Sequence, residues 1–79
     1  MIYVQRVRRD PALQALATAE KLDPNWAPTY NYRAKLYYQL NDLTPAVANY
    51  RRALALDPTL ADAREELMRA ETMLRVTGR

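Results

Sequence analysis

Apolar residues recur at helical spacing along most of this chain, and prolines separate the segments that carry them. One stripe consists of Tyr30, Ala34, Tyr37 and Leu40. A second consists of Val47, Tyr50, Ala53 and Leu54. With the prolines as boundaries, the pattern predicts helices at residues 2–8, 11–22, 26–40, 45–56 and 60–76. Only Ile2-Tyr3-Val4, which is β-branched and aromatic, leaves a strand open as an alternative.

The prolines also predict where helices begin and end. Asp10-Pro11 and Thr44-Pro45 each place a capping side chain before a proline, which predicts a helix start with the proline in the first turn. Asp23-Pro24 and Asp57-Pro58 predict the end of one helix and the start of the next, because proline disfavours a helical residue before it.

The chain repeats itself after 34 residues. Leu22-Asp23-Pro24 recurs as Leu56-Asp57-Pro58, and the same shift places other residues on identical ones: Tyr3 on Tyr37, Pro11 on Pro45, Ala12 on Ala46, Ala19 on Ala53 and Leu40 on Leu74. Leu16 falls on Tyr50. Such a period is typical of a stacked pair of helices.

The central unit carries a family resemblance. It reads Tyr30-x2-Arg33-Ala34-x2-Tyr37, then Ala46-x3-Tyr50, then Pro58, which resembles the tetratricopeptide repeat pattern W-x2-L-G-x2-Y, A-x3-F, P. The resemblance implies an all-α fold of antiparallel helix pairs stacked as a short right-handed solenoid. Small Ala34 and Ala46 would let two helices approach closely. Arg33 stands where the pattern has leucine, and we expect its stem to pack while its head reaches water.

On this reading, residues 1–79 form a single domain of unequal units. Residues 1–26 are a partial repeat, 27–60 a full repeat, and 61–79 a capping helix. We expect this helix to have a polar outer face and to end at Gly78. The chain bears a formal net charge of +3 and has no cysteine, no histidine and one glycine. We therefore expect no catalysis, no cofactor and no metal. Without a signal peptide or an apolar span of about 20 residues, we expect a cytoplasmic protein that does not cross a membrane.

Function in the resembled family lies in a groove lined by the first helix of each pair. The resemblance implies that this groove binds a peptide or helix of a partner through exposed side chains, namely Asn31, Lys35, Tyr38, Gln39, Asp62, Glu65, Arg69, Thr72 and Met73. Lys35 and Arg69 would take an acidic group. The acids Asp62 and Glu66 argue against binding of acidic chaperone tails and favour a partner of mixed or basic character. A solvated helix face is the alternative for each of these side chains.

Two other functions remain open. The short N-terminal segment leaves part of the next helices uncovered, which predicts exposure of Leu13, Leu16, Trp26 and Tyr30. Preceding repeats would cover this face, or a second copy would cover it in a homodimer, by exchange of a helix. More distantly, Arg6, Arg8 and Arg9 would bind nucleic acid or anionic lipid electrostatically.

Overall fold

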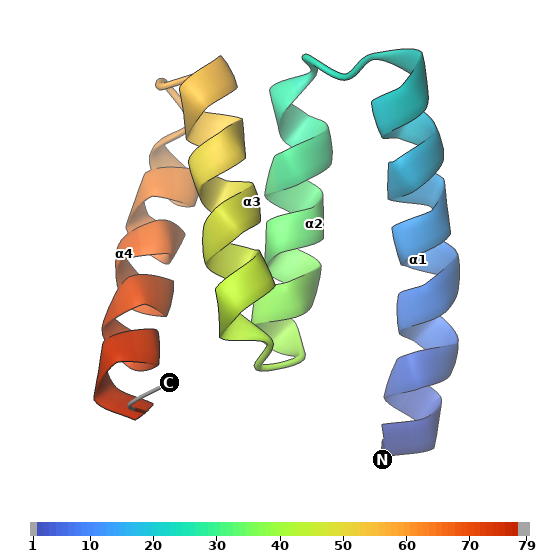
Figure 1. Ribbon diagram of the computed structural model, residues 1–79, viewed down its shortest axis with the longest axis horizontal. Coiled ribbons are helices and arrows are strands. Elements are labelled where there is room, and N and C mark those ends of the chain that lie inside the picture. The colour runs from blue at the N-terminus through green and yellow to red at the C-terminus, as the bar shows by residue number, and fades with distance from the viewer. Residues whose placement is uncertain (1, 78–79) are drawn as a thin grey trace.

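The computed structural model contains four α-helices: α1 (Ile2–Leu22), α2 (Ala27–Gln39), α3 (Leu43–Leu56) and α4 (Ala61–Thr77). It describes the backbone of residues 2–77 and the side chains of residues 11–77. Each helix runs antiparallel to the one before it, from α1 on one side to α4 on the other (Figure 1). Between residues 2 and 77 the structure has no strand, so the prediction of an all-α fold is confirmed.

The predicted start of α3 needs one correction. The helix begins at Leu43, and Asp42 precedes it without a side-chain capping bond. Thr44 is therefore inside the helix and does not cap it. Pro45 still lies in the first turn, where its missing N–H leaves no hydrogen bond unmade.

The predicted helix break at Asp10-Pro11 is wrong, because α1 is one continuous helix with Pro11 inside it. The central unit explains why. Its turn between α2 and α3 contains Asn41 with φ 62°, a left-handed conformation that asparagine tolerates. A shift of 34 residues places Val7 on Asn41. A β-branched residue strongly disfavours positive φ, so the first unit lacks this turn and the helix continues.

The turns at the Leu-Asp-Pro motifs repeat in their hydrogen bonds as well as in sequence. The Asp23 carboxylate accepts from the backbone N–H of Asn25 at 3.2 Å. The Asp57 carboxylate accepts from the backbone N–H of Thr59 at 3.0 Å. Both motifs end one helix and precede the next, which confirms their predicted role.

The last helix reproduces a contact of α2 with a different side chain. Tyr30 Oη donates to the backbone carbonyl of Pro24 at 2.7 Å. One period later, Arg64 Nη2 donates to the carbonyl of Pro58 at the same distance. The arginine keeps the hydrogen bond while presenting a charge to solvent. Gly78, the predicted end of this helix, lies outside the described residues.

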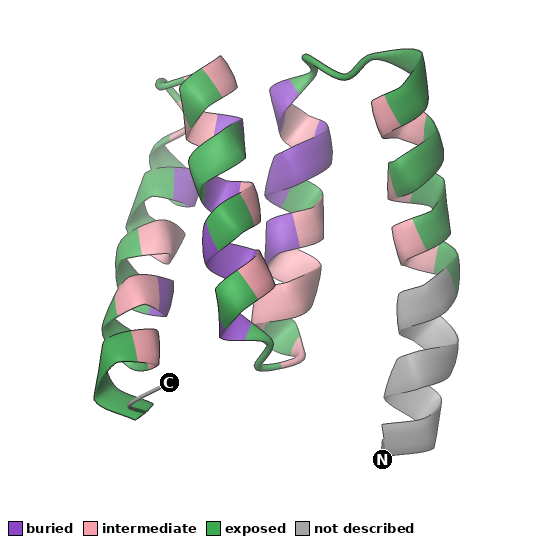
Figure 2. Ribbon diagram, viewed as in Figure 1, coloured by how far each residue is buried: buried purple, intermediate pink, exposed green. Residues whose placement is uncertain are grey.

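The core lies where α2, α3 and α4 meet. Ala34, Ala46 and Ala63 come from these three helices, and together with Tyr50 they form a cluster with 0% exposure. The predicted close approach at Ala34 and Ala46 is confirmed. The buried segments in Figure 2 lie along α2, α3 and the facing side of α4. None of residues 11–22 in α1 is buried, so the described part of α1 lies outside the core.

Candidate functional site

Four of the predicted groove residues come together in one hollow between α2 and α4. The hollow measures about 450 Å³. Its lining consists of Tyr38 from α2 and Met68, Arg69, Thr72 and Met73 from α4. Tyr38 Oη lies 3.4 Å from the sulfur of Met73, so the two helices touch at the floor of this site. Tyrosine and methionine supply apolar area that adapts to different ligands.

Met68 belongs to this hollow although the sequence analysis omitted it. Its side chain is exposed, like that of Met73. The signal was present in the spacing, because Met68 follows Glu65 by three residues and precedes Thr72 by four. Residues at these spacings share one face of a helix.

The two groove cations are paired with carboxylates of the groove itself. Lys35 Nζ lies 2.9 Å from Asp62 Oδ2, which joins α2 to the first turn of α4. This hydrogen bond lowers the pKa of Asp62 and raises the pKa of Lys35. Arg69 lies 3.8 Å from Glu65 in an exposed pair of the kind that contributes little stability. Of the two cations, Arg69 is therefore the more available to a partner.

This hollow is not lined by the other predicted groove residues, namely Asn31, Lys35, Gln39, Asp62 and Glu65. Asn31 is buried, so its expected exposure is wrong, and its Oδ1 has no hydrogen-bond partner among the described residues. Gln39 is exposed, but it lines a different hollow of about 380 Å³ between α1 and α2. The other residues of that hollow are Ala12, Leu16, Tyr32, Lys35 and Leu36.

The predicted self-association face is only partly exposed. Trp26 is 52% exposed, in the connection between α1 and α2. Leu13 and Leu16 are half-buried. Tyr30 is 4% exposed, so its predicted exposure is wrong. Its ring lies against the guanidinium groups of Arg33 and Arg52, 5.6 and 5.4 Å from the ring centroid.

Arg33 connects three helices, a role that the sequence analysis missed. Its Nη2 lies 2.7 Å from Glu20 Oε1 of α1, and its Nη1 lies 3.4 Å from Asn49 Oδ1 of α3. The side chain is 17% exposed. The expectation that its head reaches water is therefore wrong, because the guanidinium is held by these partners.

The repeat contains the signal for this ion pair. One period later, Glu20 becomes Leu54 and Arg33 becomes Leu67. Both leucines pack against the buried cluster. The same two positions are therefore apolar at one junction between units and ionic at the other, which makes the attachment of α1 more polar than that of α4.

The Glu20–Arg33 pair predicts a pH-dependent attachment of α1. The Arg33 hydrogen bond lowers the pKa of Glu20 from its ordinary 4.5, and the charges of Arg33 and Arg52 and a hydrogen bond from Tyr30 act in the same direction. A lowered folded-state pKa stabilises the fold above pH 4.5, and this contribution is lost as the pH falls through the lowered value. We expect the emission of Trp26, the only tryptophan, to change in this window before far-UV circular dichroism does.

The control for this titration is Glu20→Gln, which cannot ionise. Its Trp26 emission should show no separate step at acid pH. A step of unchanged size in Glu20→Gln would contradict the assignment to Glu20.

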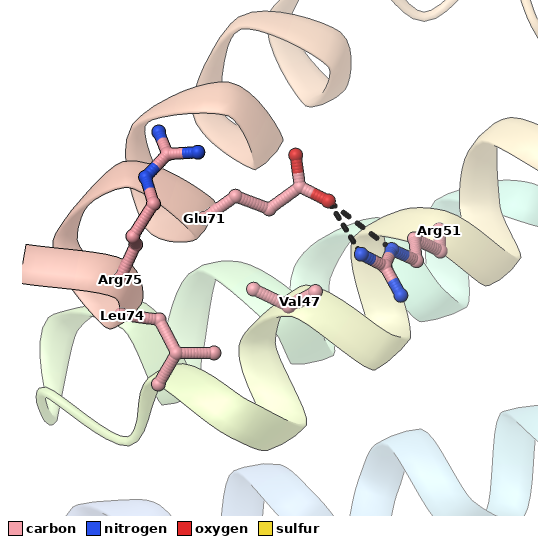
Figure 3. A pocket seen from close by; sticks show the side chains of 5 residues that line it. All are labelled: Val47, Arg51, Glu71, Leu74 and Arg75. Carbon is pink, nitrogen blue, oxygen red and sulfur yellow. Dashed lines mark hydrogen bonds and ion pairs between the residues drawn. The ribbon is translucent and has the colours of Figure 1, made fainter. Parts of the chain in front are cut away.

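A third hollow, of about 390 Å³, lies between α3 and α4 (Figure 3). Arg51 of α3 reaches across it to Glu71 of α4, with Nη2 and Nε lying 2.6 and 3.2 Å from the same carboxylate oxygen. Val47 and Leu74 lie beneath this pair. Because these two charges satisfy each other, the pair fastens α4 to α3, and the remaining charge in the lining is that of Arg75.

The described side chains include no cluster that could hold a metal ion. Among residues 11–77, no three acidic side chains gather as potential metal ligands. Within the same part of the chain, no helix has the length and hydropathy needed to span a bilayer. The side chains of Arg6, Arg8 and Arg9 lie outside the described residues, so electrostatic binding of nucleic acid or lipid stays a prediction.

Four antiparallel helices with a turn that recurs after 34 residues define a helical-repeat protein. Residues 34–67 match the family described as TPR repeat, so the resemblance is confirmed for this segment. Such repeats generally mediate protein–protein interactions and typically serve as non-enzymatic scaffolds. Comparisons with curated proteins and with solved structures gave no match.

Proposed function

We propose that the chain is a protein-interaction module that binds a peptide or helix of a partner between α2 and α4. The observation that carries this proposal is the hollow that Tyr38, Met68, Arg69, Thr72 and Met73 line together. Its surface is mostly apolar, with one cation at its edge. An apolar side chain of the partner fills the hollow, and polar groups around it orient the rest of the peptide.

The charges around the hollow favour a basic partner. Asp62 pairs with Lys35 and Glu65 with Arg69, and the charge of Glu66 also acts on Lys35. Since Lys35 is held by Asp62, an acidic peptide would have to displace that carboxylate and would find only Arg69 available. A basic peptide would instead share the carboxylates. The preferred ligand therefore carries an apolar residue flanked by lysine or arginine.

Two synthetic peptides test this specificity. Both contain a central leucine, flanked by lysines in one and by glutamates in the other. We expect the lysine peptide to bind at least about tenfold more tightly, a difference of about 1.4 kcal/mol, in isothermal titration calorimetry. Equal affinities would contradict the proposed preference, and no binding of either peptide would contradict the site.

A pair of matched variants locates the binding. Met73→Lys places a charge inside the hollow, whereas Val76→Lys makes a similar change on the same helix at a residue that is 78% exposed and outside the hollow. We expect Met73→Lys to abolish binding of the lysine peptide and Val76→Lys to leave it nearly unchanged. Equal losses in the two variants would place the binding elsewhere.

We also propose self-association as a second function, supported by a comparison within the chain. Ala46 and Tyr50 are fully buried. Their counterparts one period earlier, Ala12 and Leu16, are half-buried and line the hollow between α1 and α2. A second copy would cover these side chains. A measurement of molar mass in solution tests this function, and a monomer at high concentration would contradict it.

A further inference from the structure

Because α1 is continuous, the first residues of the chain lie away from the later part of the same helix. In the central unit, the corresponding residues fold back and cover the helix that follows them. Residues 2–9 correspond to residues 36–43 one period later. In the central unit the chain reverses at Asn41, so that α2 folds back against α3. In the first unit Val7 replaces Asn41, and residues 2–9 continue along the axis of α1 (Figure 1).

The surface left behind contains the counterparts of two residues of the central core. In the central unit Tyr37 packs against the cluster that contains Ala46 and Tyr50. The counterparts of those two residues, Ala12 and Leu16, line the hollow of about 380 Å³ together with Leu36 of α2. The counterpart of Tyr37 is Tyr3, an identical residue. The chain thus contains both the hollow and the segment that matches it.

The segment cannot reach the hollow of its own chain while α1 is straight. Residues 3 and 12 lie nine positions apart in one helix, which separates their Cα atoms by about 14 Å along its axis. Fold-back would require a reversal near Val7, and valine disfavours the left-handed conformation that makes the equivalent reversal at Asn41.

We propose that two copies exchange residues 2–9, so that this segment of each chain occupies the hollow beside Ala12 and Leu16 of the other. The inference rests on the proposed self-association and specifies its geometry. The two α1 helices run antiparallel, and each exchanged segment takes the place that residues 36–40 hold against α3 within the central unit. The exchange is symmetric, so the assembly closes at two copies.

Repulsion between arginines opposes the exchange and makes the stability of the dimer depend on salt concentration. Each segment carries Arg6, Arg8 and Arg9, and antiparallel contact brings the two sets toward each other. Salt screens this repulsion, because the Debye length shortens from about 10 Å at 0.1 M to about 3 Å at 1 M. We therefore expect the dimer to dissociate less at the higher salt concentration.

The oligomeric state of turn variants tests the proposal. Replacing Arg6-Val7-Arg8-Arg9 by the sequence Leu-Asn-Asp-Leu of residues 40–43 installs the turn of the central unit. We expect the unchanged chain to sediment as a dimer and this variant as a monomer of unchanged helicity. Val7→Ala, which favours a straight helix, is the matched control and should stay dimeric.

The outcomes separate this inference from self-association in general. A monomeric unchanged chain would overturn both. A dimeric chain whose turn variant is an equally stable dimer would overturn the exchange alone and leave self-association by another geometry.

Engineered cysteines give a second measurement that does not depend on the turn variant. The chain has no cysteine of its own. Tyr3→Cys and Ala12→Cys proteins, unfolded together, refolded and oxidised, should form mixed disulfide dimers, because a disulfide needs Cα atoms within about 7 Å. Tyr3→Cys mixed with Thr18→Cys, an exposed position of α1, is the control. Equal yields in the two mixtures would overturn the exchange.

Discussion

We expect Tyr50→Ala to destabilise the protein by about 3–5 kcal/mol, as is typical for truncation of a buried aromatic side chain. Tyr50 is fully buried and contributes the bulk of a cluster whose other fully buried members are alanines. Loss of the ring therefore leaves a cavity beside these alanines. Because small domains have total stabilities of only about 5 kcal/mol, most of the variant should be unfolded at room temperature.

Urea unfolding followed by circular dichroism measures this loss, with Tyr50→Phe as the control. Phenylalanine keeps the ring and removes the bond from Tyr50 Oη to Glu66 Oε1, which is 2.7 Å long. Glu66 is half-buried and accepts water instead, so we expect a cost of about 1 kcal/mol. A loss in Tyr50→Ala no greater than in Tyr50→Phe would show that the cluster does not depend on the ring.

The same hydrogen bond affects the ionisation of Tyr50. Burial raises the pKa of its phenol, and the bond to Glu66 raises it further, because ionisation would place two negative charges side by side. The phenol therefore stays protonated well above the range in which an exposed tyrosine ionises.

The repeat and its core could be predicted from the sequence because their signals are local. Leu-Asp-Pro ends a helix through the side chain of its aspartate and the ring of its proline, both within a few residues of the turn. Ala34 and Ala46 indicate a close approach through their size alone. These features depend on no distant residue, and the structure confirms each of them.

The first helix shows where such local signals are insufficient. Asp10-Pro11 and Thr44-Pro45 both place a capping residue before a proline, and the first turn of a helix tolerates proline. What separates the two units is the residue four positions before the proline, Val7 in one and Asn41 in the other. The proline is compatible with the start of a helix in both units. Only the asparagine allows the chain to reverse, so a new helix begins only after Asn41.

The candidate groove also has a part that the sequence predicts and a part that it does not. Helical spacing places Tyr38, Arg69, Thr72 and Met73 on facing sides of α2 and α4, so their meeting at one hollow was predictable. The partners of the charges were not. The Lys35–Asp62 pair joins residues 27 positions apart, and its formation depends on the distance between two helices that no local pattern specifies.

We expect Ala34→Leu to cost about 1–3 kcal/mol, the usual penalty for extra methylene groups in a packed core. Ala34 is fully buried in the same cluster as Ala46 and Ala63, at the meeting of three helices, so a leucine there must push α2 away from α3 or from α4. Displacement of α4 would also open the hollow between Tyr38 and Met73. Peptide affinity should therefore fall together with stability, although residue 34 touches no ligand.

Ala55→Leu, at an exposed position of α3, is the control and should change the unfolding free energy by less than about 0.5 kcal/mol. Equal effects of the two substitutions in urea unfolding would contradict the close helix contact, and lost stability with unchanged peptide affinity would separate the core from the groove.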